Sequence, residues 1–349
     1  MKKFKKILAL CLTAALAMSL FAGCAKDEDK GDASGSHESS NSESKDYKIA
    51  VVPKMTNIGW FQRMEEGVKA YNDEHGTDYL YGGSTEGADQ AAYVESLLAE
   101  DWDAICVVPF DSQSLAPVLE KARKAGIVVI THEAASMDPQ YFDYDVEAFL
   151  NADYGANFAK QLVELNNGEG TYVQLVGDLN SVSHNEWCDA ADAYFAENSK
   201  MVKLGRFETG DDTTSSYNQI KELLQAHPEI NAIEGSASTD VAGAAQAVSE
   251  LGLSGQVKIV GTSMTTICAD YINDGTIASF SVWDPAEAGK AMIETALAVL
   301  EADGELDVAN THLTATGYET LVPGEGTPTV LYGNARVDVT KDNMADYNF

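Results

Sequence analysis

The sequence predicts an α/β protein built from two doubly wound, parallel-sheet (Rossmann-like) lobes. Short apolar runs rich in β-branched residues alternate with amphipathic segments of helical length from residue 48 to residue 302. The links between them are short, which favours parallel strands joined by helical crossovers. The alternation stops after Asp145 and then starts again, so we expect two similar halves. About 300 residues are also enough for two domains.

The first half opens on an apolar strand at residues 48–53, which breaks at Pro53-Lys54. A loop carrying Trp60 and Phe61 follows, and then a helix at 62–74. The next expected elements are a strand at 78–83, a helix at 89–100, a strand at 104–108, a helix at 114–125 and a strand at 127–131.

The second half repeats the pattern. We expect helices at 151–165, 184–197, 213–226, 239–251, 266–274 and 285–302, and strands at 170–176, 202–207, 232–234, 257–261 and 277–282. The last helix has a proline at its first turn, where the missing backbone N–H costs nothing.

Polar and aromatic residues follow the expected strands at their carboxyl ends, which is where doubly wound folds bind ligands. We expect these residues to line a crevice between the two lobes. They are Lys54, Asp111, Glu133, residues 181–185, residues 236–239, Ser263 and Trp283-Asp284, together with Trp60 and Phe61 after the first strand.

The amino-terminal end predicts secretion. A run of lysines precedes the apolar residues 7–21, and the small residues Ala22-Gly23 precede Cys24, which is typical of a signal peptide over 1–23. Residues 24–46 contain no aromatic side chain and no aliphatic one larger than alanine, so they indicate a disordered tether. No later segment reaches the ~18 apolar residues that a spanning helix needs.

Composition excludes several classes of function. The net charge is -32, and removal of residues 1–23 takes away four lysines and no acids, which argues against nucleic acid and anionic lipid as partners. Cys106, Cys188 and Cys268 have no CxxC spacing, so free buried thiols are expected, with a disulfide pair as the alternative. The sequence has no metal-binding histidine spacing, phosphate loop or nucleophile elbow, so we expect no metal, no cofactor and no enzyme.

Several segments resemble the type I periplasmic-binding-protein family, the sugar-binding subunits of ABC importers. They are the start KIAVV, the segment DAICVVPFDSQSLAPVLEKARKAGIVVITHE, the segment NAIEGSASTDVAGAAQAV and the strand KIVGTS. Pro53-Lys54, SVWDPAEAGKAM and the ending VDVTKDNMADYNF resemble the autoinducer-2 and rhamnose-type receptors in particular. Ala22-Gly23-Cys24 resembles a bacterial lipobox, which implies that Cys24 carries a lipid.

The resemblance implies a hinged clamp that closes on its ligand. Three chain crossings are expected, near residues 145, 281 and 312. The lobes would then comprise residues 47–145 plus 283–312, and residues 146–282 plus 313–349.

The resemblance also implies binding residues. Lys54 and Asp111 match residues that the autoinducer-2 receptors use, whereas Ser183, His184, Ser236 and Ser238 depart from their pattern. Because the replacements are hydroxyls and an imidazole, the implied ligand remains polyhydroxylated: a rhamnose-like or pentose sugar, or an autoinducer-2-like molecule. The predicted binding residues are Lys54, Trp60, Phe61, Asp111, Glu133, His184, Asn185, Ser236, Ser238 and Trp283.

The chemistry of these residues suits a sugar. Carboxylates accept hydrogen bonds from hydroxyls, lysine donates up to three, and aromatic rings cover apolar faces. Other roles remain open. Asp111 could cap a helix, Glu133 could be a solvated loop residue, and the aromatic residues could belong to the core. Asp284 is favoured as the cap of the last helix.

The sequence therefore predicts a monomeric, lipid-anchored binding protein on the extracytoplasmic face of the cell membrane. Its partners would be a small sugar-like ligand and the transmembrane subunits of an ABC permease. The alternative is a sensor domain that reports the ligand to a membrane signalling protein.

Overall fold

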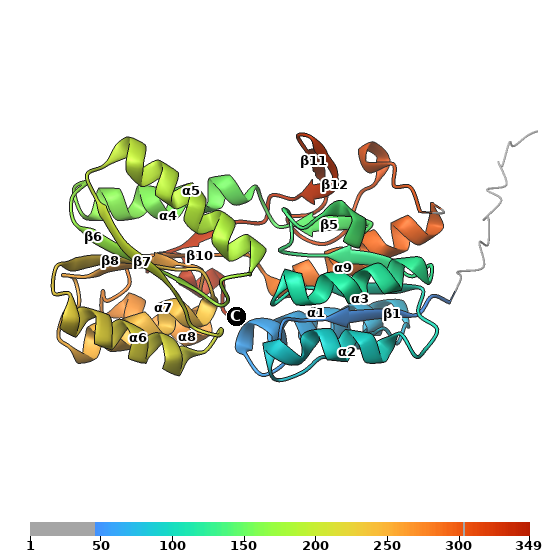
Figure 1. Ribbon diagram of the computed structural model, residues 1–349, viewed down its shortest axis with the longest axis horizontal. Helices are drawn as coiled ribbons and strands as arrows, with labels where there is room; N and C mark the ends of the chain where they lie inside the picture. The colour runs from blue at the N-terminus through green and yellow to red at the C-terminus, as the bar shows by residue number, and fades with distance from the viewer. Residues whose placement is uncertain (1–45, 303) are drawn as a thin grey trace, which may run out of the picture. The chain divides into compact units, whose positions relative to one another are not determined.

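The computed structural model describes residues 46–302 and 304–349 (Figure 1). The predicted signal peptide, Cys24 and all but the last residue of the predicted tether lie outside these residues. The described chain from Asp46 to Phe349 forms one compact unit. Within it, two parallel sheets form two α/β lobes, as the sequence predicts.

The first lobe is built on a seven-stranded sheet in the order β11-β12-β5-β4-β3-β1-β2. All neighbours are parallel except the hairpin β11–β12. The strands are β1 (Ile49–Val52), β2 (Leu80–Tyr81), β3 (Ala104–Val107), β4 (Val128–Thr131), β5 (Tyr144–Glu147), β11 (Val322–Gly324) and β12 (Thr327–Tyr332).

Helices cover both faces of this sheet, and alternate residues of β1 show why. Ile49 and Val51 belong to the same apolar cluster as residues of α1 and α9, whereas Ala50 and Val52 belong to a second cluster with residues of α2 and α3. Successive side chains of a strand point to opposite faces, so each face of the sheet has its own core. The helices are α1 (Gly59–His75), α2 (Gln90–Leu97), α3 (Ser112–Lys124) and α9 (Pro285–Glu301), with 3-10 turns η1 (Gly87–Asp89), η2 (Pro139–Tyr141) and η3 (Val308–Asn310).

The second lobe contains a parallel sheet in the order β7-β6-β8-β9. The antiparallel pair β10–β13 extends it through a bridge between Thr262 and Ser281. The strands are β6 (Thr171–Val176), β7 (Val202–Glu208), β8 (Ile230–Gly235), β9 (Lys258–Gly261), β10 (Phe280–Val282) and β13 (Val337–Val339). The helices are α4 (Asn151–Leu165), α5 (Val182–Asn198), α6 (Thr213–Ala226), α7 (Ser238–Glu250) and α8 (Thr265–Asn273), followed by η4 (Met344–Asp346).

Two glycines let helices cross at close range. A Cβ atom on Gly67 of α1 would lie 2.2 Å from the backbone oxygen of Ala286 in α9. A Cβ atom on Gly155 of α4 would lie 2.0 Å from the backbone oxygen of Trp187 in α5. Because real side chains cannot approach so closely, glycine is needed at both crossings. These crossings fix α1 and α5, two helices that carry predicted site residues.

The chain passes between the two sheets three times, at residues 148–150, 283–284 and 333–336. The third crossing, predicted near residue 312, was placed wrongly. Strand β12 pairs with β5 of the first lobe, with Val330 beside Asp145, so β11 and β12 belong to the first sheet and not to the second lobe. This pairing joins segments far apart in the sequence, so no local pattern signals it.

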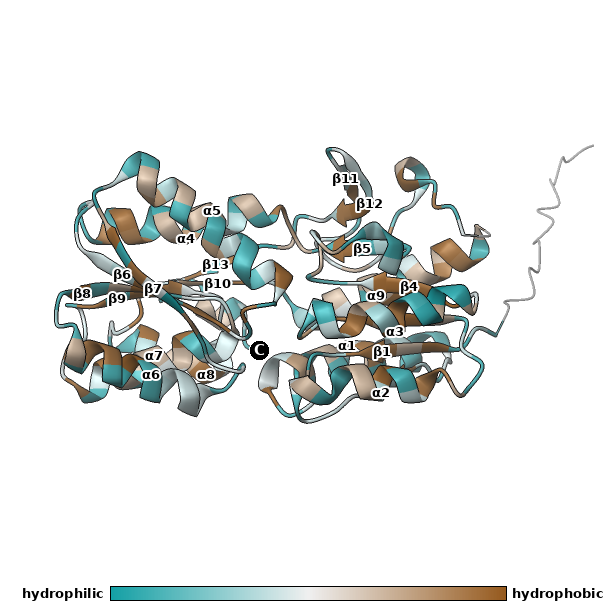
Figure 2. Cartoon of the chain, in the orientation of Figure 1, coloured by the Kyte–Doolittle hydropathy of each residue, from teal (hydrophilic) through white to brown (hydrophobic). Residues whose placement is uncertain are grey.

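The hydropathy of the chain follows this layering. In Figure 2 the strands β1, β6 and β9 are mostly brown, while the helices combine teal and brown along their length. Of the described helices, none combines the length and the apolar character that crossing a lipid bilayer requires. Cys106, Cys188 and Cys268 are buried free thiols, which confirms the first of the two expectations for them.

Candidate functional site

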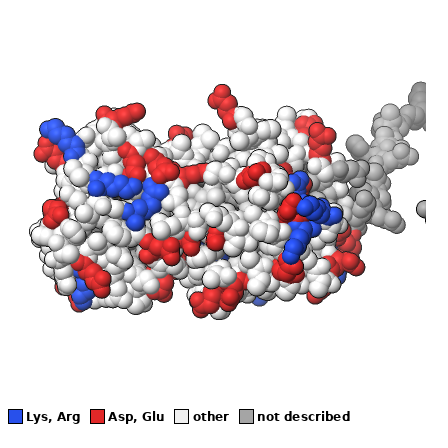
Figure 3. All heavy atoms as spheres, viewed as in Figure 1, with Lys and Arg blue, Asp and Glu red and all other residues white. Residues whose placement is uncertain are grey.

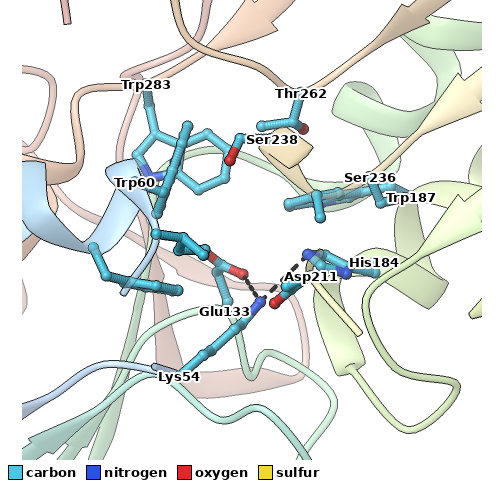
Figure 4. A pocket seen from close by; sticks show the side chains of 13 residues that line it. Lys54, Trp60, Glu133, His184, Trp187, Asp211, Ser236, Ser238, Thr262 and Trp283 are labelled. Atoms are coloured by element: carbon cyan, nitrogen blue, oxygen red, sulfur yellow. Dashed lines mark hydrogen bonds and ion pairs between the residues drawn. The ribbon is translucent and has the colours of Figure 1, made fainter. Parts of the chain in front are cut away.

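A small cavity lies where the carboxyl ends of both sheets meet (Figure 4). Residues that directly follow β1, β4, β7, β8, β9 and β10 line it, together with the first turns of α1 and α5. The lining residues are Lys54, Ile58, Trp60, Phe61, Glu133, His184, Trp187, Asp211, Ser236, Ala237, Ser238, Thr262 and Trp283.

A buried ion pair forms one wall of the cavity. Nζ of Lys54 lies 2.6 Å from Oε2 of Glu133, and each side chain is only 3% exposed. Burial alone would lower the pKa of Lys54, but Glu133 and Asp211 outweigh it and raise that pKa. Burial would likewise raise the pKa of Glu133, but the charge of Lys54 and its hydrogen bond outweigh burial and hold it at about 2. Both side chains are therefore charged near neutral pH.

The second lobe contacts this ion pair directly. Oγ of Ser183 donates a hydrogen bond of 3.1 Å to Oε2 of Glu133, and Nε2 of His184 lies 3.3 Å from Nζ of Lys54. Figure 4 shows the amine of Lys54 between Glu133 and His184. The two lobes therefore meet at the charged wall of the cavity, in a closed arrangement.

Backbone strain is concentrated at the same place. Within residues 46–302 and 304–349, the non-glycine residues with positive φ are Glu133 (φ 60°), Asp211 (φ 53°) and Asn167. The first two line the cavity. Glutamate rarely adopts this left-handed conformation, which costs of order 1–3 kcal/mol and persists where the surroundings enforce it. Here Oε1 of Glu147 accepts hydrogen bonds from the backbone N–H groups of Ala134 and Ala135 and so holds the turn after Glu133.

Asp211 is a second acid in the cavity. It is buried, and its Oδ1 atom has no hydrogen-bond partner among the described residues. Burial raises its pKa to about 6, although Lys54 opposes the shift. A buried carboxylate oxygen without a partner is costly, unless a bound molecule donates a hydrogen bond to it. Asp211 is therefore a candidate acceptor for a ligand hydroxyl.

Tryptophan rings form the apolar wall. Trp60 packs against Trp283 edge to face with ring centroids 4.5 Å apart, and Trp187 packs against Trp283 at 5.8 Å. These rings come from α1, from the second hinge crossing and from α5, so both lobes contribute. Such a wall can cover the C–H face of a flat ring and exclude water from it.

The structure brings eight of the ten predicted site residues to this cavity: Lys54, Trp60, Phe61, Glu133, His184, Ser236, Ser238 and Trp283. Asp111 and Asn185 do not line it. The Oδ1 atom of Asp111 accepts a hydrogen bond of 2.9 Å from the backbone N–H of Gln113 and caps α3, so the alternative role as a helix cap is the one observed. The side chain of Asn185 turns away, since Arg206 and the backbone of residues 178–181 bind it.

The variant Asp111→Ala is expected to leave ligand affinity unchanged within about twofold, because Asp111 does not line the cavity. It should lower the free energy of unfolding by about 1 kcal/mol, the usual cost of losing an N-cap. Calorimetric titration with a sugar that the wild type binds measures the affinity, and urea unfolding measures the free energy of unfolding. A tenfold loss of affinity would show that Asp111 does contribute to ligand binding.

Sequence reasoning missed Ile58, Trp187, Asp211 and Thr262. Asp211 follows the end of β7 in the segment Thr209-Gly210-Asp211, so the strand-end rule applied to that strand would have found it. Trp187 lies three residues after His184 on α5, and residues at this spacing share one helix face.

Two lobes that close over a shared polar and aromatic cavity define the class of solute-binding proteins. The chain belongs to the periplasmic binding protein domain family, whose model matches residues 49–305. The family predicted from the sequence is confirmed, and so is the expectation of a binding protein rather than an enzyme.

Similar proteins include binding proteins named for sugars. The D-ribose/D-allose-binding protein of Pseudomonas aeruginosa is 28% identical over 265 residues, which cover 72% of this chain and 82% of that protein. The ribose import binding protein of Escherichia coli is 26% identical over 269 residues, covering 76% of this chain and 88% of that protein.

Solved structures with the same fold include two binding proteins from clostridia. A solute-binding protein from Clostridium phytofermentans with bound L-rhamnose has a TM-score of 0.79 at 19% identity, covering 86% of this chain and 98% of that one. An autoinducer-2 complex from Clostridium saccharobutylicum has a TM-score of 0.78 at 20% identity, covering 86% of this chain and 100% of that one.

Proposed function

We propose that the protein is the extracytoplasmic solute-binding component of an ABC importer. It binds a monosaccharide or an autoinducer-2-like molecule in the cavity between the lobes and delivers it to a permease. The single observation that carries this proposal is the buried Lys54–Glu133 pair, contacted by Ser183 and His184 from the opposite lobe. Burying two charged side chains costs desolvation free energy, so a buried pair at the lobe interface indicates a functional role. Binding of a polar ligand between the lobes is such a role.

The lining chemistry favours a polyhydroxylated ligand. Glu133 and Asp211 accept hydrogen bonds, Lys54 donates them, and the hydroxyls of Ser236, Ser238 and Thr262 do both. The tryptophan wall suits the apolar face of a sugar ring. Relatives named for ribose, allose and xylitol agree with this choice.

The same proposal includes a location and a lipid anchor. The predicted signal peptide and Cys24 would tether the binding unit to the outer side of the cell membrane. Relatives named as periplasmic proteins support the extracytoplasmic part.

Figure 3 shows many acidic side chains on one face, with the basic ones mostly close to acidic neighbours. Described ion pairs of this kind include Arg206–Asp189 and Lys203–Asp192.

A thermal-shift screen tests the proposal. The purified protein is heated with single pentoses, deoxyhexoses and autoinducer-2, and the true ligand should stabilise it by about 2.7 kcal/mol at one hundred times Kd. Asp111→Ala serves as a matched control and should respond as the wild type does. Failure of every compound to shift a well-folded sample would refute the proposal, and so would conversion of the compound into a product.

A further inference from the structure

The proton of the buried His184 ring has a defined position. The backbone N–H of Gly177 donates to Nδ1 of His184 at 3.1 Å, so that nitrogen must be unprotonated. Burial first, and then the charge of Lys54, lowers the pKa of His184 well below its ordinary value. The ring is therefore neutral, and a neutral imidazole with a bare Nδ1 carries its proton on Nε2.

The alternative ring orientation is unfavourable. Turning the ring by 180° would place carbon where Nδ1 now accepts the N–H of Gly177. That buried backbone N–H would then lose the only hydrogen bond that the described residues give it. A buried donor without a partner is costly, so the hydrogen bond with Gly177 fixes the ring.

The Nε2–H group then faces a second donor. Nε2 lies 3.3 Å from Nζ of Lys54, which is protonated because it pairs with Glu133 at 2.6 Å. An N–H group and an ammonium cannot bond to each other, since neither offers a lone pair. Two donors therefore converge at this point of the cavity, and neither satisfies the other.

We propose that Lys54 and the Nε2–H group of His184 form a two-donor subsite that selects a ligand oxygen able to accept both hydrogen bonds. The inference rests on the proposed function and deepens it. A carbonyl oxygen, a ring oxygen or a hydroxyl fits this position. A ligand amine does not fit, because it would meet two donors and a like charge.

Gly177 is the positioning residue for this subsite in two ways. Its backbone N–H occupies Nδ1 of His184 and so places the ring proton on Nε2. Its lack of a side chain leaves room for the carboxylate of Asp211. A Cβ atom on Gly177 would lie 1.9 Å from Oδ1 of Asp211. Asp211 therefore lies beside His184 and Lys54 in the same cavity, where it can accept a hydrogen bond from a ligand hydroxyl that they hold (Figure 4).

Long-range ¹H–¹⁵N NMR of the histidine rings tests the first half of the inference. The His184 resonances, assigned by their loss in His184→Gln, should show a neutral ring protonated at Nε2 near pH 7. His132 is the internal control, because its Nδ1 lies 2.5 Å from the backbone oxygen of Val146 and must carry a proton there. A His184 ring protonated at Nδ1, or at both nitrogens, would overturn the inference.

Binding measurements test the second half with the sugar that gives the largest thermal shift. His184→Met removes the donor at similar size and should weaken binding on the order of tenfold. His184→Gln keeps an N–H donor and should recover part of that loss. If the wild type binds no sugar of the panel, the proposed function fails. If the wild type binds and His184→Met binds equally well, only the two-donor subsite fails.

Discussion

Lys54→Met is expected to abolish measurable ligand binding and to destabilise the fold at the same time. The substitution removes the only positive charge that pairs with Glu133 within the described residues. The carboxylate would then remain buried without a countercharge, which costs about 3–5 kcal/mol in comparable cases. Urea unfolding measures the loss of stability, and calorimetric titration measures the loss of binding.

The double variant Lys54→Met/Glu133→Gln separates the two effects. Replacing both charges leaves no unpaired ion in the cavity, so most of the lost stability should return. Binding should not return, because the donor and the charged acceptor are both gone. A double variant that is no more stable than Lys54→Met would contradict the view that the pair matters through its charges.

Glu234→Gln is expected to stabilise the protein at neutral and alkaline pH and to change little near pH 4. Glu234 lies in the middle of the second sheet on β8, and its Oε2 accepts a hydrogen bond of 3.0 Å from Gln174 while Oε1 has no partner in the described chain. Burial raises its pKa to about 8. Because this pKa is higher in the folded state, the folded protein keeps a proton that the unfolded chain releases.

The sign of the pH effect follows from that difference. The contribution of Glu234 to stability is fully present below the unfolded pKa near 4.5 and is lost as the pH rises towards 8. The wild type should therefore lose up to ~1.4 kcal/mol of unfolding free energy per pH unit from this group alone. Glutamine mimics the protonated acid and removes that slope.

Urea unfolding at pH 4.0, 7.0 and 8.5 measures the effect. Asp211 and Asp240, with pKa values raised to about 6 and about 7 by burial, should leave a residual slope of the same sign in the variant. Glu65→Gln, at an exposed position of α1, is the matched control and should follow the wild type. A variant with the same pH dependence as the wild type would show that folding does not raise the pKa of Glu234.

Local sequence patterns were sufficient to predict helices, whose backbone hydrogen bonds join residues close together in the sequence. The helix expected at 151–165 is α4, and the helix expected at 213–226 is α6, with the same bounds. Strands β5, β11, β12 and β13 were missed. Strands β11 and β13 have only three residues each, and β12 and β13 pair with partners that lie far away in the sequence. A strand that is defined by its distant partner has a weak pattern of its own.

The same distinction applies to the candidate site. The strand-end rule found Lys54 and Glu133, because the apolar runs before them are fully or largely buried and end clearly. It missed Asp211, because β7 is half-exposed and its apolar run is interrupted. It wrongly included Asp111, because a strand-end aspartate can point either into the crevice or onto the helix that follows. Only the packing of α3 decides between them.

The strand pairing of residues 327–339 has a consequence for the order in which the protein folds. Strand β12 completes the edge beside β5, and β13 pairs with β10, so residues 327–339 give one strand to each lobe. A nascent chain still lacking them has an open sheet edge at β5 and an unmatched strand at β10. Neither lobe can therefore complete its sheet until residues 327–339 have been synthesised.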